Sequence, residues 1–211
     1  MGLTINGVVG GNNPQTKGSQ PQQFRMDASG GVATAKLHGD YYEAAARNTM
    51  FSGSNLTGVV TTVGFATTHT GLCLSNPIGS GVNLVLNKVK YAILVQQTTA
   101  LVFGLQTGYS ASTNVTQTTP MVVGGNFVGQ PAGVGLLAAA ATLPIAPTRL
   151  ILLDSLLTGA ITVGFNGGNV LDMQGSLVIP PGGFVATYTS AASVAASMLF
   201  GFTWEEVPIT L

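Results

Sequence analysis

Few residues in this chain could carry out catalysis. It has two histidines, His38 and His69, and one cysteine, Cys73. His69 and Cys73 are four residues apart, and a histidine beside a thiol can activate it as a nucleophile. The pattern offers no third group to orient the histidine, so the sequence favours a partly exposed histidine in a threonine-rich turn and a buried Cys73. A single cysteine also provides no disulfide framework and no thiolate metal site.

The carboxylates are equally sparse. Glu205 and Glu206 are adjacent on an expected strand, where neighbouring side chains point to opposite faces. They therefore do not form the paired carboxylates of a glycosidase. Asp154 and Asp172 follow expected strands near turns, where aspartate commonly binds its own backbone, and a calcium site would need several converging carboxylates. We predict no catalytic residue, no metal site and no cofactor.

Three further motifs have simpler explanations than a binding site. Gly79-Ser80-Gly81 resembles part of a phosphate loop, but no Gly-Lys-Ser/Thr follows and a strand comes next, so we expect a turn. The acceptor pattern for glycosylation at Asn55 arises by chance in a threonine-rich chain. Trp204, the only tryptophan, could support a sugar ring, but core or interface packing is favoured.

The chain is almost devoid of charge. Charged residues make up 7% of it, against roughly 25% in an ordinary soluble domain. No Asp, Glu, Lys or Arg occurs between Lys90 and Arg149, and seven basic residues balance seven acidic ones. A protein that stays monomeric usually carries interspersed charge and a net charge away from zero. The composition thus predicts an assembly component, and the scattered basic residues argue against nucleic-acid binding.

Composition also indicates the fold class. The chain has 29 glycines and many β-branched residues, which favour sheet with frequent turns over helix. The longest apolar run, Val134–Ala146, is interrupted by Pro144 and is shorter than the ~20 residues that span a bilayer, so no membrane segment is expected. The N-terminus lacks the basic start and apolar core of a secretory signal.

Residues 1–55 are expected to differ from the rest. The polar run over 11–23 has little to bury, so we predict an extended arm over residues 1–37 that is ordered by contact with a partner. A helix is predicted over Asp40–Thr49, where Asp40 and Glu43 have the spacing of a capping box and Glu43 with Arg47 forms an (i, i+4) ion pair on a solvated face. This part is assigned to anchoring and oligomer contacts.

Residues 56–211 are predicted to form an all-β body, a jelly-roll-like β-sandwich, with an immunoglobulin-like sandwich as the alternative. Two lysines interrupt the apolar face of the strand over 83–95, so that strand should cross an edge or carry a bulge. The stretch Thr107–Pro147 is either an interface-packed loop insertion or two weak strands. The predicted strands are Gly58–Ala66, Thr70–Ser75, Asn83–Val95, Ala100–Gln106, Arg149–Leu153, Ala160–Phe165, Ser176–Ile179, Phe184–Ser190 and Met198–Val207.

A set of short motifs in a fixed order resembles a group of virion structural proteins of tailed bacteriophages. The motifs are Tyr41-Tyr42-Glu43-Ala44-Ala45-Ala46-Arg47-Asn48, Phe51-Ser52-Gly53, Leu74-Ser75-Asn76-Pro77-Ile78-Gly79-Ser80-Gly81-Val82-Asn83-Leu84, Pro180-Pro181-Gly182-Gly183 and Phe202-Thr203-Trp204-Glu205-Glu206. The resemblance covers roughly residues 38–208. It implies a capsid decoration (cement) protein or a head- or tail-fibre component, located in the virion after assembly in the host cytoplasm, and carries over no catalytic residue.

The composition and the resemblance lead to the same expectation. We predict a homotrimer formed by the uncharged β body, with dimers or higher rings as alternatives, bound to the major capsid protein or another virion protein. The arm could reach roughly 100 Å along a neighbour if extended. A receptor- or glycan-binding fibre domain is the alternative function, with Tyr109, Phe127 and Tyr188 as candidate contact residues, although core or interface packing is favoured for each of them. A glycan depolymerase relying on Glu206 or Asp172 is the enzymatic alternative.

Overall fold

The fold is described from a computed structural model of the full chain. It describes residues 39–95, 97, 100–156, 168–195 and 197–209, and two short stretches nearer the N-terminus. The chain divides into the units Met1–Asp40 and Tyr41–Leu211. In the first unit, β1 (Asn6–Gly7) and β2 (Gln22–Gln23) pair antiparallel. The rest of the predicted arm, with His38, lies outside the described residues.

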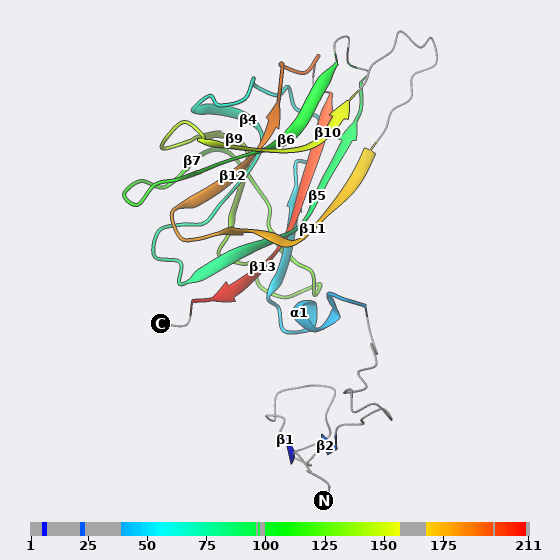
Figure 1. The fold of residues 1–211 in the computed structure, drawn as a ribbon, viewed down its shortest axis with the longest axis vertical. Helices are drawn as coiled ribbons and strands as arrows, with labels where there is room; N and C mark the ends of the chain where they lie inside the picture. Colours follow the sequence, from blue (N-terminus) through cyan, green and yellow to red (C-terminus); the bar gives the residue numbers. More distant parts are fainter. Residues whose placement is uncertain are drawn as a thin grey trace, which may run out of the picture. The chain divides into compact units, whose positions relative to one another are not determined.

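The second unit is almost entirely β-structure (Figure 1). It begins with one short helix, α1 (Tyr42–Ala46). The strands that follow are β3 (Met50–Ser54), β4 (Thr68–Ser75), β5 (Val82–Ile93), β6 (Leu101–Tyr109), β7 (Thr116–Met121), β8 (Gly124–Gly125), β9 (Leu136–Thr142), β10 (Arg149–Leu156), β11 (Gly168–Ile179), β12 (Gly183–Thr189) and β13 (Met198–Pro208).

These strands form two antiparallel sheets. The six-stranded sheet has the order β10-β6-β12-β4-β9-β7, and the five-stranded sheet has the order β11-β5-β13-β3-β8. The pairs are nested: β3 with β13, β4 with β12, β5 with β11 and β6 with β10. A long hairpin rolled into two sheets has this pattern, so the predicted jelly-roll-like sandwich is confirmed. The strands β7, β8 and β9 belong to an insertion that extends both sheets.

The main core lies between the two sheets and is continuous from end to end. Its buried aromatic side chains come from both layers: Phe103 of β6 contacts Tyr91 of β5 and Phe200 of β13, with ring centroids 4.9 and 5.6 Å apart. Trp204 is also completely buried here, so the core interpretation of this tryptophan is confirmed. Burial of these apolar surfaces is the main source of stability of the sandwich.

The predicted irregularity of the lysine-bearing strand is a bulge. β5 is paired on both sides, by β11 and β13, and so does not lie at an edge. Thr203 is opposite Lys88 and the next residue, Trp204, is opposite Leu86, which leaves Asn87 as an extra residue. The extra residue shifts the alternation by one position, so Leu86 faces the core before it and Lys90 faces solvent after it.

The predicted helix over Asp40–Thr49 is too long. The N-cap is Tyr41, which makes no side-chain capping bond, so the Asp40–Glu43 capping box does not form. Asn48 adopts a left-handed φ of 54°, and the N–H groups of Asn48 and Thr49 donate to Ala45 O and Ala44 O. This is a Schellman motif, which ends the helix at once. The exposed Glu43–Arg47 ion pair is present at 3.7 Å, as predicted.

Several strand predictions need correction. Gly58–Ala66 is not a strand: apart from one bridge, Val59 to Met198, it is a loop whose backbone bonds to side chains and to neighbouring strands. β3 and the first two thirds of β11 were not predicted. The stretch Thr107–Pro147 contains β7, β8 and β9, three strands where the strand interpretation expected two. The predicted strand Ala160–Phe165 lies outside the described residues.

Candidate functional site

The two residues that could have formed a nucleophile pair are both buried. His69 and Cys73 lie on β4 and are each 1% exposed. Burial raises the pKa of the Cys73 thiol to about 12, so the thiolate that would act as a nucleophile does not form near neutral pH. Cys73 packs with alanines of β9 and β12 in a second, smaller apolar cluster. The interpretation of Cys73 as a small buried hydrophobe is confirmed.

His69 belongs to a buried polar contact beneath a loop. Gln106 of β6 donates from Nε2 to Thr187 O at 3.0 Å and contacts His69 Nδ1 at 3.5 Å. Its Oε1 accepts the N–H of Phe65 at 2.6 Å, so Gln106 holds the loop between β3 and β4 against the six-stranded sheet. His69 is therefore not the partly exposed residue predicted from the sequence. Gln106 was not predicted as part of this contact, because it is a single amide within the largely apolar strand β6.

The burial of His69 predicts loss of stability in acid. Desolvation lowers its pKa from 6.5 to about 4, although a hydrogen bond with the Leu72 backbone opposes this. Between these values the unfolded chain binds a proton that the folded chain does not, so the free energy of unfolding falls as pH drops from 6.5 to 4, by about 2–3 kcal/mol. Urea unfolding at several pH values should show this slope in the wild type and a much weaker one in His69→Gln. If the wild type and His69→Gln lost stability equally steeply with falling pH, burial of neutral His69 would not be the cause of the loss.

The carboxylates singled out in the sequence have structural partners and do not converge. Asp172 accepts from the Tyr41 hydroxyl at 3.1 Å and from the Gln174 N–H at 3.0 Å. Asp154 accepts from the Tyr91 hydroxyl and the Ser155 N–H. Within the described part of the chain, no three His, Cys, Asp or Glu residues are placed to hold a metal ion.

Glu205 and Glu206 point to opposite faces of β13, as predicted. Glu205 is half-buried and accepts from Thr49 Oγ1 at 3.3 Å. Glu206 is 7% exposed, and its carboxylate accepts the N–H groups of Val134 and Gly135 at 2.9 and 2.8 Å. Trp204 Nε1 donates to the same carboxylate at 3.3 Å. Glu206 therefore holds the loop that precedes β9 against the C-terminal end of β13.

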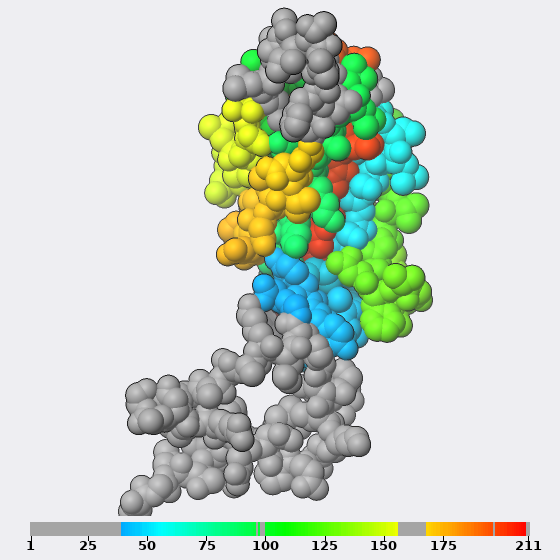
Figure 2. All heavy atoms as spheres, turned by 90° about the vertical axis from the view of Figure 1, so that its right-hand side faces the viewer, coloured from blue at the N-terminus to red at the C-terminus, as the bar shows by residue number. Residues whose placement is uncertain are grey.

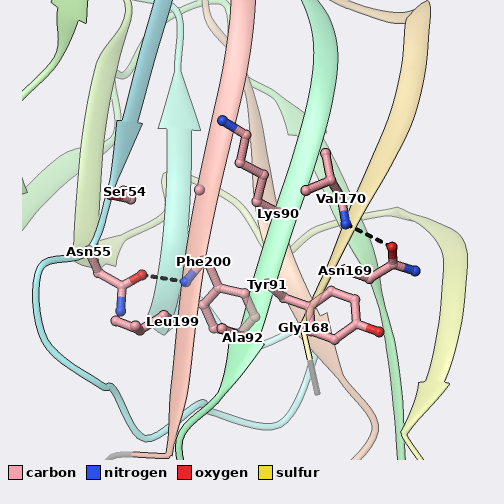
Figure 3. A pocket seen from close by; sticks show the side chains of 11 residues that line it. Ser54, Asn55, Lys90, Tyr91, Ala92, Gly168, Asn169, Val170, Leu199 and Phe200 are labelled. Carbon is pink, nitrogen blue, oxygen red and sulfur yellow. Dashed lines mark hydrogen bonds between the residues drawn. The ribbon is translucent and has the colours of Figure 1, made fainter. Parts of the chain in front are cut away.

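The outer face of the five-stranded sheet carries a groove of about 580 Å³ (Figure 3). Figure 2 shows β11, β5, β13 and β3 side by side on this face, with α1 at one end. The groove forms where Gly201 and Ala92 leave room between longer side chains. Lys90 lies on β5, opposite Gly201 of β13, and Asn169 lies on β11. Lys90 is exposed and has no ion-pair partner among the residues described. The groove thus combines an apolar floor with one ammonium group.

Charge is divided unequally between the two sheets. In the six-stranded sheet, β6, β12, β4, β9 and β7 carry no Asp, Glu, Lys or Arg, and only the edge strand β10 does. The five-stranded sheet carries charge on β5, β11 and β13. The loop between β3 and β4 and the insertion between β6 and β10 are also uncharged. A large part of the described surface therefore has no charge at all.

This uncharged surface exposes large aliphatic side chains. Val128 is 92% exposed, Leu56 is 80% exposed and Val122 is 79% exposed. A single exposed apolar residue is normal, but several large ones on a surface without charge favour contact with other molecules.

The three aromatic residues considered for receptor contact lie on separate elements. Tyr109 ends β6 and is 55% exposed, and Phe127 follows β8 and is 48% exposed. Neither of these two residues therefore lies in the core of the single chain. Tyr188 of β12 is half-buried and packs edge-on against Phe65, with ring centroids 5.6 Å apart.

No family model, curated protein or solved structure matches this chain. In the described part of the chain, no helix is long and apolar enough to cross a membrane.

Proposed function

We propose that this protein is a non-enzymatic structural component of a tailed-bacteriophage virion, a capsid decoration protein that stabilises the head. The observation that carries the proposal is the uncharged surface of the jelly roll with its exposed aliphatic side chains. Such a surface is stabilised when it is covered, because removing apolar area from water is the main driving force of stable association. A surface covered by neighbouring subunits needs no charge to keep it soluble.

The proposed assembly is a homotrimer that binds the major capsid protein or another virion protein. The uncharged β body would supply the contacts between copies, and residues 1–37 would dock on a neighbouring subunit. The protein would act mechanically, by adding buried area across joints between capsid subunits, after assembly in the host cytoplasm. The structural partners of Asp154, Asp172 and Glu206 support a role without turnover.

A receptor- or glycan-binding fibre domain is the second candidate, and the groove beside Lys90 favours it. An apolar floor with an ammonium group and an amide nearby suits a ligand that carries both an apolar face and an anionic group. This candidate predicts binding of acidic glycans on an array and loss of that binding in Lys90→Gln. Decoration of a capsid predicts neither.

Mass photometry of the full-length protein and of a variant without residues 1–37 tests the first proposal. We expect a trimer from both, because the contacts between copies are assigned to the β body. The two proteins should then differ in a sedimentation assay with phage heads. The full-length protein should sediment with the heads, and the variant without residues 1–37 should stay in the supernatant, because the arm is assigned to docking. Monomers from both proteins would contradict self-association through the uncharged surface.

A further inference from the structure

The side-chain amide of Gln106 is held in one orientation by two backbone groups. Its Oε1 accepts the Phe65 N–H at 2.6 Å, and its Nε2 donates to Thr187 O at 3.0 Å. A backbone N–H can only donate and a carbonyl can only accept, so exchanging Oε1 and Nε2 would break both bonds. The amide nitrogen therefore also faces His69 Nδ1, 3.5 Å away, and this ring nitrogen is the acceptor while the imidazole is neutral.

Protonation of His69 reverses the role of this ring nitrogen. An imidazolium carries a hydrogen on both nitrogens, so the Nδ1–H group would face the N–H groups of Gln106, donor against donor. Turning the amide by half a turn removes this conflict, because Oε1 then accepts from Nδ1. The same turn takes Oε1 away from the Phe65 N–H. The neutral imidazole is thus compatible with the Phe65 bond, and the imidazolium is not.

The loop is strained at the point where Gln106 binds it. We call residues 63–66 the Phe65 tip. Phe65 has a φ of 66°, in the left-handed region that bulky side chains rarely adopt, so contacts must offset the cost of this conformation. The other described contacts of the tip are a 3.2 Å bond from the Gly64 N–H to β12 and the edge-on packing of Phe65 against Tyr188. Loss of the Gln106 bond therefore favours release of the tip.

No charged side chain in the neighbouring elements can balance an imidazolium at His69. The strands β4, β6, β9 and β12 and the loop over 55–67 contain no Asp, Glu, Lys or Arg. Their titratable groups other than His69 are the thiol of Cys73 and the phenols of Tyr109 and Tyr188. The charged residues of this sheet, Arg149 and Asp154, lie on β10, which β6 and β12 separate from β4. A charged His69 is therefore stabilised only when its ring reaches water, and release of the tip admits water.

We propose that His69 and Gln106 form an acid-sensitive switch, in which protonation of His69 turns the Gln106 amide and releases the Phe65 tip from the six-stranded sheet. Burial of His69 alone would lower the stability of the whole domain in acid, whereas the position of Gln106 directs the first loss to one loop. Release also removes the tip from the ring of Tyr188. The switch operates within one chain and does not depend on the proposed place in a virion.

The size of the effect follows from the pKa of His69 in the two states. This pKa is about 4 while the tip is closed, and the ordinary value of 6.5 applies once the ring reaches water. The open state therefore binds the proton more tightly and gains population as pH falls below 6.5. Between pH 7 and pH 4 the equilibrium should shift toward the open tip by about a hundredfold, and below pH 4 the shift levels off.

Amide hydrogen exchange of the full-length protein, followed by NMR, tests the switch. Protection factors are calculated against the exchange rates of an unstructured chain at the same pH. The protection factor of the Phe65 amide should fall at least about tenfold between pH 7 and pH 4. The fluorescence of Trp204, which is buried in the main core, should remain native over the same range. His69→Gln should abolish the fall in protection, because an amide does not titrate.

Gln106→Met tests the part of the switch that binds the loop. A thioether cannot hold the Phe65 N–H as the amide does, so the tip should be poorly protected already at pH 7 and should respond little to acid. Gln117→Met is the matched control, because the Gln117 amide donates to Leu137 O of β9 instead, and it should behave like the wild type. Circular dichroism confirms that each variant is folded.

Three results would overturn the proposal. The first is a wild-type protein in which protection of the Phe65 amide is the same at pH 7 and pH 4. The second is an equal fall in His69→Gln, or a wild-type pH response in Gln106→Met, because the proton would then act through other groups. The third is loss of native Trp204 fluorescence together with Phe65 protection, which would show that acid unfolds the whole domain at once.

Discussion

Replacing Glu206 with alanine is expected to lower the free energy of unfolding by about 3–5 kcal/mol. The buried carboxylate accepts hydrogen bonds from Val134 N, Gly135 N and Trp204 Nε1. Removing it leaves these donors without their acceptor, and a buried unsatisfied donor costs about 1–3 kcal/mol. Urea unfolding followed by the fluorescence of Trp204, the only tryptophan, measures the loss.

The neighbouring residue is the control for this prediction. Glu205 lies on the opposite face of β13, is half-buried and accepts one described side-chain bond, from Thr49. Glu205→Ala should cost less than about 1 kcal/mol. Limited proteolysis should show faster cleavage near residues 130–135 in Glu206→Ala alone, because this carboxylate fastens that loop to β13. Similar losses in the two variants would show that Glu206 has no special structural role.

Phe103→Ala should destabilise the protein by a similar amount, about 3–5 kcal/mol. Phe103 is completely buried and joins the two sheets, since its ring stacks on Phe200 at 15° between planes and contacts Tyr91. Truncation to alanine removes these contacts and leaves a cavity between the two sheets. The sheets can relax around the cavity only partially, so most of its free-energy cost remains. Denaturant unfolding provides the value, and the m-value should stay close to that of the wild type.

Val102→Ala is the matched control for the cavity. Val102 precedes Phe103 on β6, points to the opposite face and is 36% exposed. Its truncation should cost less than about 1 kcal/mol. If both substitutions destabilise the protein equally, Phe103 does not form the bridge between the sheets that the structure shows.

Local patterns were sufficient to predict most of the sandwich. β5, β6, β12 and β13 have β-branched or alternating apolar residues and lie between turns rich in proline and glycine, and all were predicted close to their observed bounds. The phase break at Lys88 and Lys90 predicted either an edge crossing or a bulge, because alternation has a strict period of two, and the structure has the bulge, at Asn87.

Elements whose stability comes from distant partners were not predictable in the same way. β3 carries the short sequence Met-Phe-Ser-Gly-Ser and becomes a strand by pairing with β13, about 150 residues later in the chain. Gly58–Ala66 has strong strand formers yet stays a loop, because Thr61 and Phe65 bond to Ser193 and Gln106 side chains. Helix α1 ends early because Asn48 adopts a left-handed conformation, which a helix propensity does not reveal.

The sequence by itself determined the all-β class, the core alternation and the scarcity of charge, because each depends on residue type and nearest neighbours. Only the tertiary structure decided which surfaces of the protein lack charged side chains. The jelly roll places five uncharged strands in the six-stranded sheet, where only the edge strand β10 is charged, and it places the charged strands β5, β11 and β13 in the other sheet. It also brings the loop after β3 beside β7 and β9, where they line a common depression. Such juxtapositions arise from long-range pairing, which no local pattern encodes.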